Sequence, residues 1–510
     1  MGVGCLFSLQ RHLHMYQQSS YFLSRYFKWG SKNIGAKLYI SFIFAILEVL
    51  LMHFKLYVLL LIFALFEVIL RVFNFKIYNK TAIKKLVYTK RVIRFIAATI
   101  IISVLLIAVL IFTNNNIFAR TIISYFLILS FHIPSVILVS VGFIMQFIEK
   151  FISQKYINEA KKILKSLPNI KVIGVTGSYG KTSAKFILKK ILSEKFNVVA
   201  TPESYNTPMG IVRTIREQLK PETEIFIAEM GAKNIGDIKE LCELVNPNLG
   251  IITSVGPQHL ETFKSIENVA ATKFELADYC DCFVNFNSEA AKEKAASYVV
   301  HPYGTDKNNE VYAENISVSF KGTEFDLVNF DTRMHLSTRL LGEHNVINIV
   351  GAAAVALSLG VEPEKIKYAV NTLTPTAHRL EKKSFINGSI LLDDSYNSNP
   401  EGSAEAVKVL SQFEDKTKVI VTPGMVELGE KEYELNYKLG ELAANVCDYI
   451  ILVGEKRSLP LKKACDDKKF NSNNLFVVKA FKDSLEILNK LCNDKTVVLF
   501  ENDLPDNYAG

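Results

Sequence analysis

The sequence predicts an α/β protein with a P-loop parallel-sheet domain and a C-terminal Rossmann-like domain, preceded by an all-α transmembrane domain. Three observations support this fold class. Long apolar stretches without charges fill the first third of the chain. From residue 170 onward, β-branched runs alternate with helical patterns, which is typical of parallel α/β sheets. A glycine-rich loop ending in Lys-Thr directly follows the first of these runs.

The charge of the chain divides it into two different parts. Residues 1–150 carry 16 Lys and Arg against three Asp and Glu, a balance of +13. The remaining 360 residues carry 43 basic and 48 acidic side chains, a balance of −5. The basic excess therefore accompanies the apolar stretches, where it marks membrane topology. An acidic remainder disfavours nucleic-acid binding.

The apolar stretches are long enough to cross a lipid bilayer. Residues 95–112 and 121–148 contain 18 and 28 residues without a charge, the second interrupted by Pro134. A spanning helix needs roughly 20 apolar residues. Residues 38–70 are also apolar, and we expect two further helices that turn near His53. The alternative for that segment is one spanning helix followed by an interfacial helix.

The charges of the loops predict the orientation of these spans. Residues 71–94 carry eight Lys and Arg and residues 1–37 carry five, with no acid in either segment. Because basic loops remain cytoplasmic, four spans would place both ends and residues 151–510 in the cytoplasm. We therefore expect a multi-pass protein of the plasma (inner) membrane. Seven scattered cysteines suit a reducing compartment and argue against a disulfide framework or a structural zinc site.

The glycine-rich loop predicts a phosphate site. The run at 170–176 is typical of a buried parallel strand, and a helical pattern follows the loop. Backbone N–H groups of such a loop approach phosphate oxygens at a helix N-terminus. We expect Lys181 to reach the β- and γ-phosphates of ATP and Thr182 to ligate Mg²⁺, although Val175 stands where the full Walker pattern has glycine. The loop comprises Gly177, Ser178, Tyr179, Gly180, Lys181, Thr182 and Ser183.

Two further strands bring candidate residues to the same edge of the predicted sheet. The strand 225–230 carries Glu229 at its end, where a second magnesium ligand belongs. The strand 249–255 leads into a loop with His259, and a helix at 266–280 carries Lys273. By residue type alone, His259 is a surface residue and Lys273 is a solvated helix lysine.

The order of motifs along the chain resembles the Mur ligase family. The motifs cover roughly residues 170–455, and within the family DDSYNSNP and ELGE are most similar to the members that add D-alanyl-D-alanine to a muramoyl tripeptide. The resemblance implies an ATP-dependent, ADP-forming ligase that makes amide bonds in peptidoglycan precursors. The motifs are GSYGKTS, AEMGA, SVGPQHLETF, ATKFE, LLGEHNVINIVGAAA, HRLE, DDSYNSNPEGS and GMVELGE.

The resemblance implies a mechanism and assigns metal ligands. A substrate carboxylate attacks the γ-phosphate of ATP to give an acyl phosphate, which an incoming amine then displaces. Lys181 and Thr182 would handle the triphosphate and the first magnesium ion. Glu229 and His259 would bind magnesium, with His259 at a second ion. Lys273 matches the family lysine that is modified to a carbamate, which turns a cation into an oxygen ligand.

The resemblance also assigns residues nearer the substrates. Asn345 matches the adenine-contacting position, although its place at the start of a helix at 345–358 also predicts an N-cap. Arg379 matches the arginine that reaches the ATP phosphates. Asp394 matches an aspartate that contacts the ribose or the hinge. Asn206 matches a loop asparagine near the acceptor, although Asn-Thr-Pro is also an ordinary turn. Tyr396 and Asn397 follow Asp394 in the same loop, at the carboxyl end of a strand, where open α/β sheets bind substrates and other ligands.

Three departures from the family pattern concern the substrates. Membrane spans occupy the place of the domain that holds the UDP-sugar. Pro423-Gly424-Met425 lacks the aspartate of the family's Gly-Asp-Met, and FENDLPDNYAG stands where a Lys-Gly-Ser motif is expected. The acceptor is therefore expected to be a small-molecule cell-wall precursor, namely a UDP-muramoyl peptide. The alternative is a lipid-linked or other non-UDP acceptor.

The domain boundaries expected from these patterns are a membrane domain at 1–152, a central ATP-binding domain at 153–375 and a C-terminal Rossmann-like domain at 376–510. Two alternatives of other classes are a membrane P-loop ATPase or transporter and a degenerate ligase that serves as a scaffold. No ABC-like signature favours the transporter. The retained Lys181, Glu229, His259, Lys273 and Arg379 disfavour the scaffold.

Overall fold

The computed structural model describes residues 2–19, 21–33, 86–112, 134–330, 332–396, 398–426 and 428–502, with isolated positions between 43 and 73 and between 122 and 126. The chain divides into two compact units, residues 1–154 with 505–510 and residues 155–504. The spans predicted within 38–70 and the first part of 121–148 lie largely outside the described residues.

The first unit contains helices that pack around a small aromatic core. Its core includes Tyr16, Tyr26, Phe95 and Leu138, all buried. Among the described residues, two helices are long and apolar enough to cross a membrane, at 90–109 and 135–165. The second begins at Pro134, which suits the first turn of a helix because proline lacks an N–H. The helices with described bounds are α1 (Gly2–Gln18), α2 (Leu23–Asn33), α5 (Lys90–Phe112) and α7 (Pro134–Lys165).

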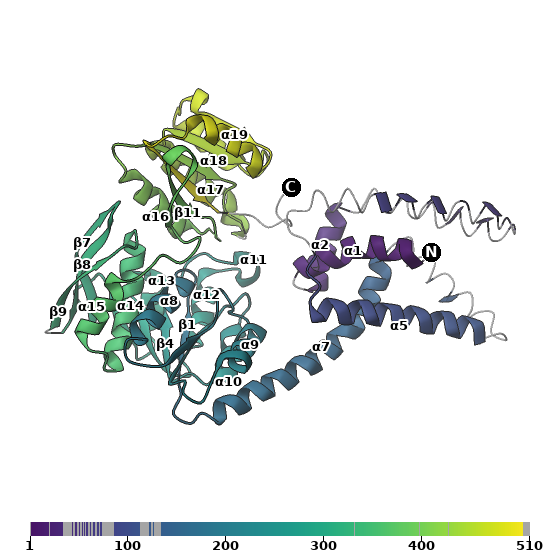
Figure 1. The fold of residues 1–510 in the computed structure, drawn as a ribbon, viewed down its shortest axis with the longest axis horizontal. Helices are drawn as coiled ribbons and strands as arrows, with labels where there is room; N and C mark the ends of the chain where they lie inside the picture. Colours follow the sequence, from purple (N-terminus) through teal and green to yellow (C-terminus); the bar gives the residue numbers. More distant parts are fainter. Residues whose placement is uncertain are drawn as a thin grey trace. The chain divides into compact units, whose positions relative to one another are not determined.

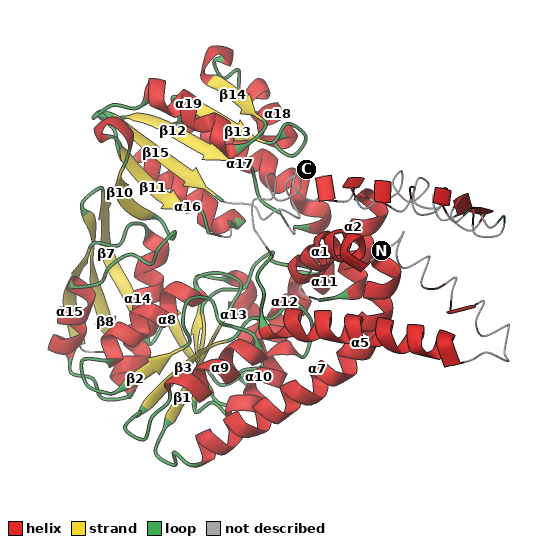
Figure 2. Cartoon of the chain, turned by 45° about the vertical axis from the view of Figure 1, so that its right-hand side comes forward, coloured by secondary structure: helices red, strands yellow, loops and turns green. Residues whose placement is uncertain are grey.

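The second unit begins with a nine-stranded sheet in the order β2-β3-β1-β4-β5-β6-β7-β8-β9 (Figures 1 and 2). Strands β2 to β7 run parallel, and β7, β8 and β9 are antiparallel. The bounds are β1 (Lys171–Thr176), β2 (Val198–Ala200), β3 (Ile225–Glu229), β4 (Leu249–Ile252), β5 (Asp281–Asn285), β6 (His301–Gly304), β7 (Val311–Ser319), β8 (Gly322–Asn329) and β9 (Thr332–Thr338).

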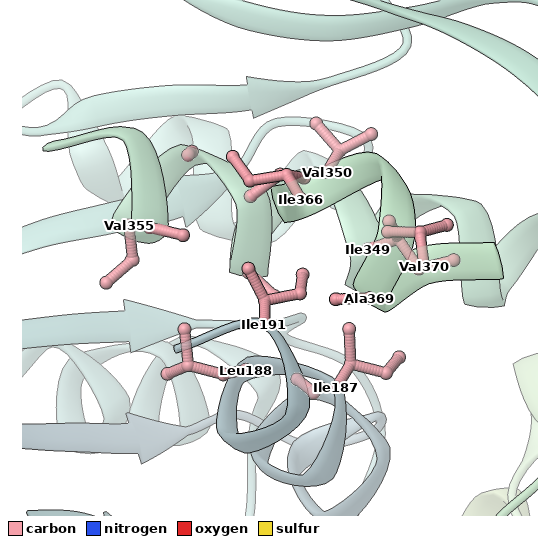
Figure 3. Packing of buried hydrophobic residues seen from close by; sticks show 14 of the residues in the cluster. Ile187, Leu188, Ile191, Ile349, Val350, Val355, Ile366, Ala369 and Val370 are labelled. Carbon is pink, nitrogen blue, oxygen red and sulfur yellow. The ribbon is translucent and has the colours of Figure 1, made fainter. Parts of the chain in front are cut away.

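Helices cover both faces of this sheet, which explains why its strands read as continuous apolar runs. In β3, Ile225 and Ile227 belong to the core on one face, and Phe226 and Ala228 belong to the core on the other. Helices α8, α14 and α15 supply side chains to the first core together with the strands, and Figure 3 shows the packing of these helix side chains. The helices are α8 (Lys181–Leu192), α9 (Pro208–Gln218), α10 (Asp237–Val245), α11 (Leu260–Phe263), α12 (Ile266–Phe274), α13 (Glu289–Ala295), α14 (Glu343–Ser358) and α15 (Pro363–Asn371).

A six-stranded sheet follows, in the order β10-β11-β15-β12-β13-β14. Strand β10 is antiparallel to β11, and the other pairs are parallel. The prediction of a mixed α/β chain with parallel sheets is confirmed. The strands are β10 (Glu381–Ser384), β11 (Ile390–Asp394), β12 (Thr417–Thr422), β13 (Tyr449–Val453), β14 (Leu475–Val478) and β15 (Thr496–Glu501), and the helices are α16 (Pro400–Ser411), α17 (Glu432–Val446), α18 (Leu459–Asp467) and α19 (Phe481–Leu491).

Candidate active site

The phosphate loop connects the end of β1 to the start of α8. Gly177 and Gly180 have φ angles of 146° and 76°, a region that glycine adopts at little cost. A Cβ atom at Gly177 would lie 2.1 Å from the hydroxyl of Thr253, and one at Gly180 would lie 2.7 Å from the side-chain oxygen of Asn348. Both glycines are therefore required by backbone angle and by space, as a close turn around phosphate demands.

The two residues between these glycines fasten the loop to the segment after β4. Ser178 Oγ donates a hydrogen bond to the carbonyl of Gly256 at 3.1 Å, and Tyr179 OH donates to the carbonyl of Pro257 at 2.7 Å. Burial raises the pKa of Tyr179, so that it remains a neutral donor. Ser178 and Tyr179 thus fix the loop through their side chains.

Lys181 lies across the loop. Its Nζ donates to the carbonyls of Gly177 at 2.7 Å and Ser178 at 2.9 Å. Burial lowers the pKa of Lys181 to about 8; Glu229 opposes this shift and Arg379 adds to it. If a nucleotide binds, its phosphate oxygens would replace these two carbonyls as the hydrogen-bond acceptors of the Lys181 ammonium group.

Glu229, at the end of β3, gathers the polar side chains around the loop. Thr182 Oγ1 donates to the Glu229 carboxylate at 3.0 Å, and Asn206 Nδ2 donates to its other oxygen at 3.1 Å. Lys185 Nζ forms a buried ion pair with Glu229 Oε2 at 2.9 Å. The structure thus brings together three residues singled out from the sequence and adds Lys185. Lys185 stands three residues after Thr182 and therefore on the same helix face, and this spacing is the sequence feature that could have identified it.

His259 and Lys273 stand in the segment that follows β4. His259 precedes α11 with a φ of 50°, a strained angle for a residue other than glycine. Lys273 lies in α12 and is only 1% exposed, so its description as a solvated helix lysine is wrong. Burial lowers the pKa of Lys273 well below its ordinary value, with Lys181 adding to the shift and Asp237 and Glu275 opposing it.

A cavity of about 640 Å³ opens beside the phosphate loop. Its apolar wall includes Phe186 and Leu340, and its polar wall includes residues from the loop, α14 and the segment before β10. Such a mixture suits a nucleotide, which presents a flat base and polar phosphates. The residues predicted from the sequence that line it are Thr182, Ser183, Asn345, Arg379 and Tyr396.

Asn345 lies inside the first turn of α14 rather than at its N-cap, which is Gly342. The expected capping role is therefore wrong. Its Nδ2 instead donates to the carbonyl of Leu341 at 2.8 Å. Asn345 is buried and lines the cavity, so its side-chain oxygen is a candidate hydrogen-bond acceptor for a bound ligand.

Arg379 and Tyr396 act as one element of the cavity wall. Arg379 Nη1 donates to the carbonyl of Tyr396 at 2.7 Å, and the guanidinium lies 4.6 Å from the centre of the Tyr396 ring. Tyr396 OH is 2.6 Å from Ser204 Oγ. These contacts join the segment after β11 to the segment after β2. Asn397 lies outside the described residues.

Asp394, at the end of β11, is not among the residues that line the cavity. Its Oδ1 accepts a hydrogen bond from the Leu380 backbone at 3.0 Å, and it pairs in register with Glu501 of β15. Burial raises the pKa of Asp394, and Arg379 opposes the shift. These contacts fix Asp394 between the segment before β10 and β15. His378, which the sequence did not single out, lines the cavity and bonds Asp393 at 2.8 Å.

The donors at the phosphate loop fit magnesium. The Thr182 hydroxyl and the Glu229 carboxylate adjoin each other and offer hard oxygen ligands. Within the described part of the chain, no group of three or more His, Cys, Asp or Glu is gathered for a metal. A metal ion here therefore needs further oxygens, such as those of a nucleotide.

Comparisons with known proteins agree with this geometry. The B. subtilis (strain 168) UDP-N-acetylmuramoyl-tripeptide–D-alanyl-D-alanine ligase is 27% identical over 347 residues, covering 67% of this chain and 75% of that enzyme. The E. coli K12 enzyme of the same name is 31% identical, covering 56% of this chain and 65% of that enzyme. The matched part of the chain thus spans 75% of the first relative and 65%, slightly less than two thirds, of the second.

Solved structures give the same result. MurF from Acinetobacter baumannii aligns with a TM-score of 0.62 and 25% identity, covering 70% of this chain and 78% of that one. The ADP complex of MurF ligase from Thermotoga maritima aligns with 0.61 and 26%, covering 70% and 81%. The Mur ligase middle domain matches residues 175–356, and the Mur ligase glutamate ligase domain matches residues 378–501. The chain therefore belongs to the Mur ligase family of ATP-dependent ligases that form C–N bonds.

Proposed function

We propose that this protein adds D-alanyl-D-alanine to a UDP-muramoyl peptide in peptidoglycan precursor synthesis. The observation that carries the proposal is that the phosphate loop, through Thr182, and Arg379 line one cavity, in a chain whose curated relatives bear that ligase's name. The Thr182 hydroxyl also donates a hydrogen bond to the buried Glu229 carboxylate behind this wall. Membership of a ligase family favours this activity over a membrane transporter.

The residues of the site suit an acyl-phosphate route. An oxygen of the acceptor carboxylate attacks the γ-phosphorus of ATP, and the bond to the β-phosphate oxygen breaks to release ADP. The amine then attacks the acyl carbon, loses a proton and expels phosphate. Lys181 and Arg379 would hold the charge that spreads over the phosphoryl oxygens, which is the main contribution of a protein to phosphoryl transfer.

We propose two magnesium ions at this site. Their protein ligands would be Thr182, Glu229, His259 and a carbamate on Lys273. Magnesium would supply charge neutralisation at the phosphates. Burial lowers the pKa of Lys273 and so favours the neutral amine, which is the form that reacts with carbon dioxide. A carbamate on Lys273 would place an anionic oxygen on this buried side chain.

The proposal includes a membrane anchor. A membrane domain at 1–152 would hold an ATP-binding domain at 153–375 and a C-terminal domain at 376–510 in the cytoplasm. The outer face of α5 supports it, because Ile100, Val104 and Leu105 are about half exposed and apolar. A lipid bilayer covers such a surface without polar partners.

Product analysis tests the proposal and resolves the acceptor. We expect the purified full chain in detergent, given ATP, Mg²⁺ and D-alanyl-D-alanine, to form an amide with a UDP-muramoyl tripeptide, detected by mass spectrometry. Omitting either substrate should leave ATP intact. If an amide forms only with a lipid-linked acceptor, that acceptor is the substrate instead of the UDP-linked peptide. ATP hydrolysis without an amide on any acceptor would contradict ligation.

A further inference from the structure

Lys185 occupies an unusual position beside the proposed magnesium carboxylate. Both Lys185 and Glu229 are buried, at 0% and 1% exposure, and their charged groups are 2.9 Å apart. Lys185 Nζ also donates to the carbonyl of Glu203. Because both partners are fully desolvated, the ion pair is a fixed part of the site rather than a surface contact.

The Glu229 carboxylate is already satisfied without a metal ion. One oxygen accepts from Thr182 and Asn206, and the other accepts from Thr182 and Lys185. Lys181 and Arg379 also lie within electrostatic reach of Glu229. One carboxylate thus faces three cations. A dication that entered alone would meet excess positive charge at close range, whereas a triphosphate brings the anionic oxygens that offset it.

We propose that Lys185 is an internal counter-ion of Glu229 that keeps divalent cations off the site until a nucleoside triphosphate binds. This inference rests on the proposed function, since it takes the loop as the ATP site. The described ranges hold no cluster of three or more His, Cys, Asp or Glu residues that could bind a metal ion by themselves, which is consistent with this role of Lys185. Lys185 therefore orders the binding events: the metal enters with the nucleotide, and its remaining ligands are phosphate oxygens.

The test measures metal binding without turnover. Mn²⁺ is titrated into the full chain without nucleotide and followed by electron paramagnetic resonance. We expect Lys185→Met to bind Mn²⁺ at least about tenfold more tightly than the wild type, because a like charge beside the ion has been removed. Lys189→Met, on the exposed side of the same helix, should leave the affinity unchanged. An affinity of Lys185→Met equal to or weaker than that of the wild type would overturn the inference.

The wild-type protein supplies a second measurement that does not depend on the variant folding. Mn²⁺ alone should leave its melting temperature unchanged, and Mn²⁺ with a non-hydrolysable ATP analogue should raise it. A clear rise with Mn²⁺ alone would also overturn the inference. If the analogue with Mn²⁺ causes no rise and does not bind, the proposed function fails instead. Adding Glu229→Gln to Lys185→Met should abolish the gain in Mn²⁺ affinity, which assigns that gain to the carboxylate.

Discussion

Lys181→Met should lower the rate of amide formation by about 10³-fold, since mutations that remove a donor from a charge-stabilising site typically cost roughly 10² to 10³. Lys181 is the loop cation, and its Nζ donates hydrogen bonds to the carbonyls of Gly177 and Ser178. Methionine keeps the unbranched shape and most of the length of the side chain, so the fold should remain. The measurement is ADP release with both substrates present, together with the melting temperature.

The pKa of Lys181 adds a pH dependence to the same prediction. The ammonium form binds phosphate, and burial brings its pKa in the ligand-free enzyme to about 8. Below this value the group is charged, so kcat/KM for ATP should fall as the pH rises through about 8. Lys292→Met, at an exposed position of α13, serves as the matched control with wild-type rate and profile. Activity of Lys181→Met within a few fold of the wild type would remove the loop from the mechanism.

Lys273→Ala should lower the ligase rate by about 10²-fold or more, because the carbamate oxygen of the proposed metal site is lost. Short carboxylates added to the solution should restore part of the rate, since they place an oxygen ligand in the space left by the side chain. The measurement is the rate against acetate or formate concentration. The same salts should not change the rate of the wild type or of Lys292→Ala.

Two outcomes would contradict the carbamate assignment. One is full activity of Lys273→Ala without added carboxylate. The other is an inactive variant that keeps its melting temperature and shows no rescue at any carboxylate concentration. Because Lys273 is buried, a loss of melting temperature is measured alongside the rate, so that unfolding is not read as a missing ligand.

Features with a local cause were predictable from the sequence. The parallel strands read as β-branched runs because both faces of the sheet are covered, and the loop at Gly177 and Gly180 is specified by glycine itself. Glu229 was predictable because a strand end at the edge of a parallel sheet fixes where its side chain arrives.

Features that depend on tertiary packing were not predictable in the same way. The burial of Lys273 and the ion pair of Lys185 arise from elements distant in sequence, and both side chains sit in ordinary helical patterns. The hydrogen bond of Asn345 to Leu341 depends on where α14 begins, which is two residues earlier than expected. The antiparallel strands β7 to β9 alternate between buried and more exposed residues, a local pattern from which no strand was predicted.

The central claim is that the protein joins a carboxylate to an amine through an acyl phosphate. Isotope transfer tests it most directly. The acceptor peptide is labelled with ¹⁸O in its carboxylate and incubated with the full chain, ATP, Mg²⁺ and D-alanyl-D-alanine. The account predicts one labelled oxygen in the inorganic phosphate for each amide formed, because that oxygen leaves with the phosphoryl group. Unlabelled phosphate, or phosphate release without amide, would contradict it.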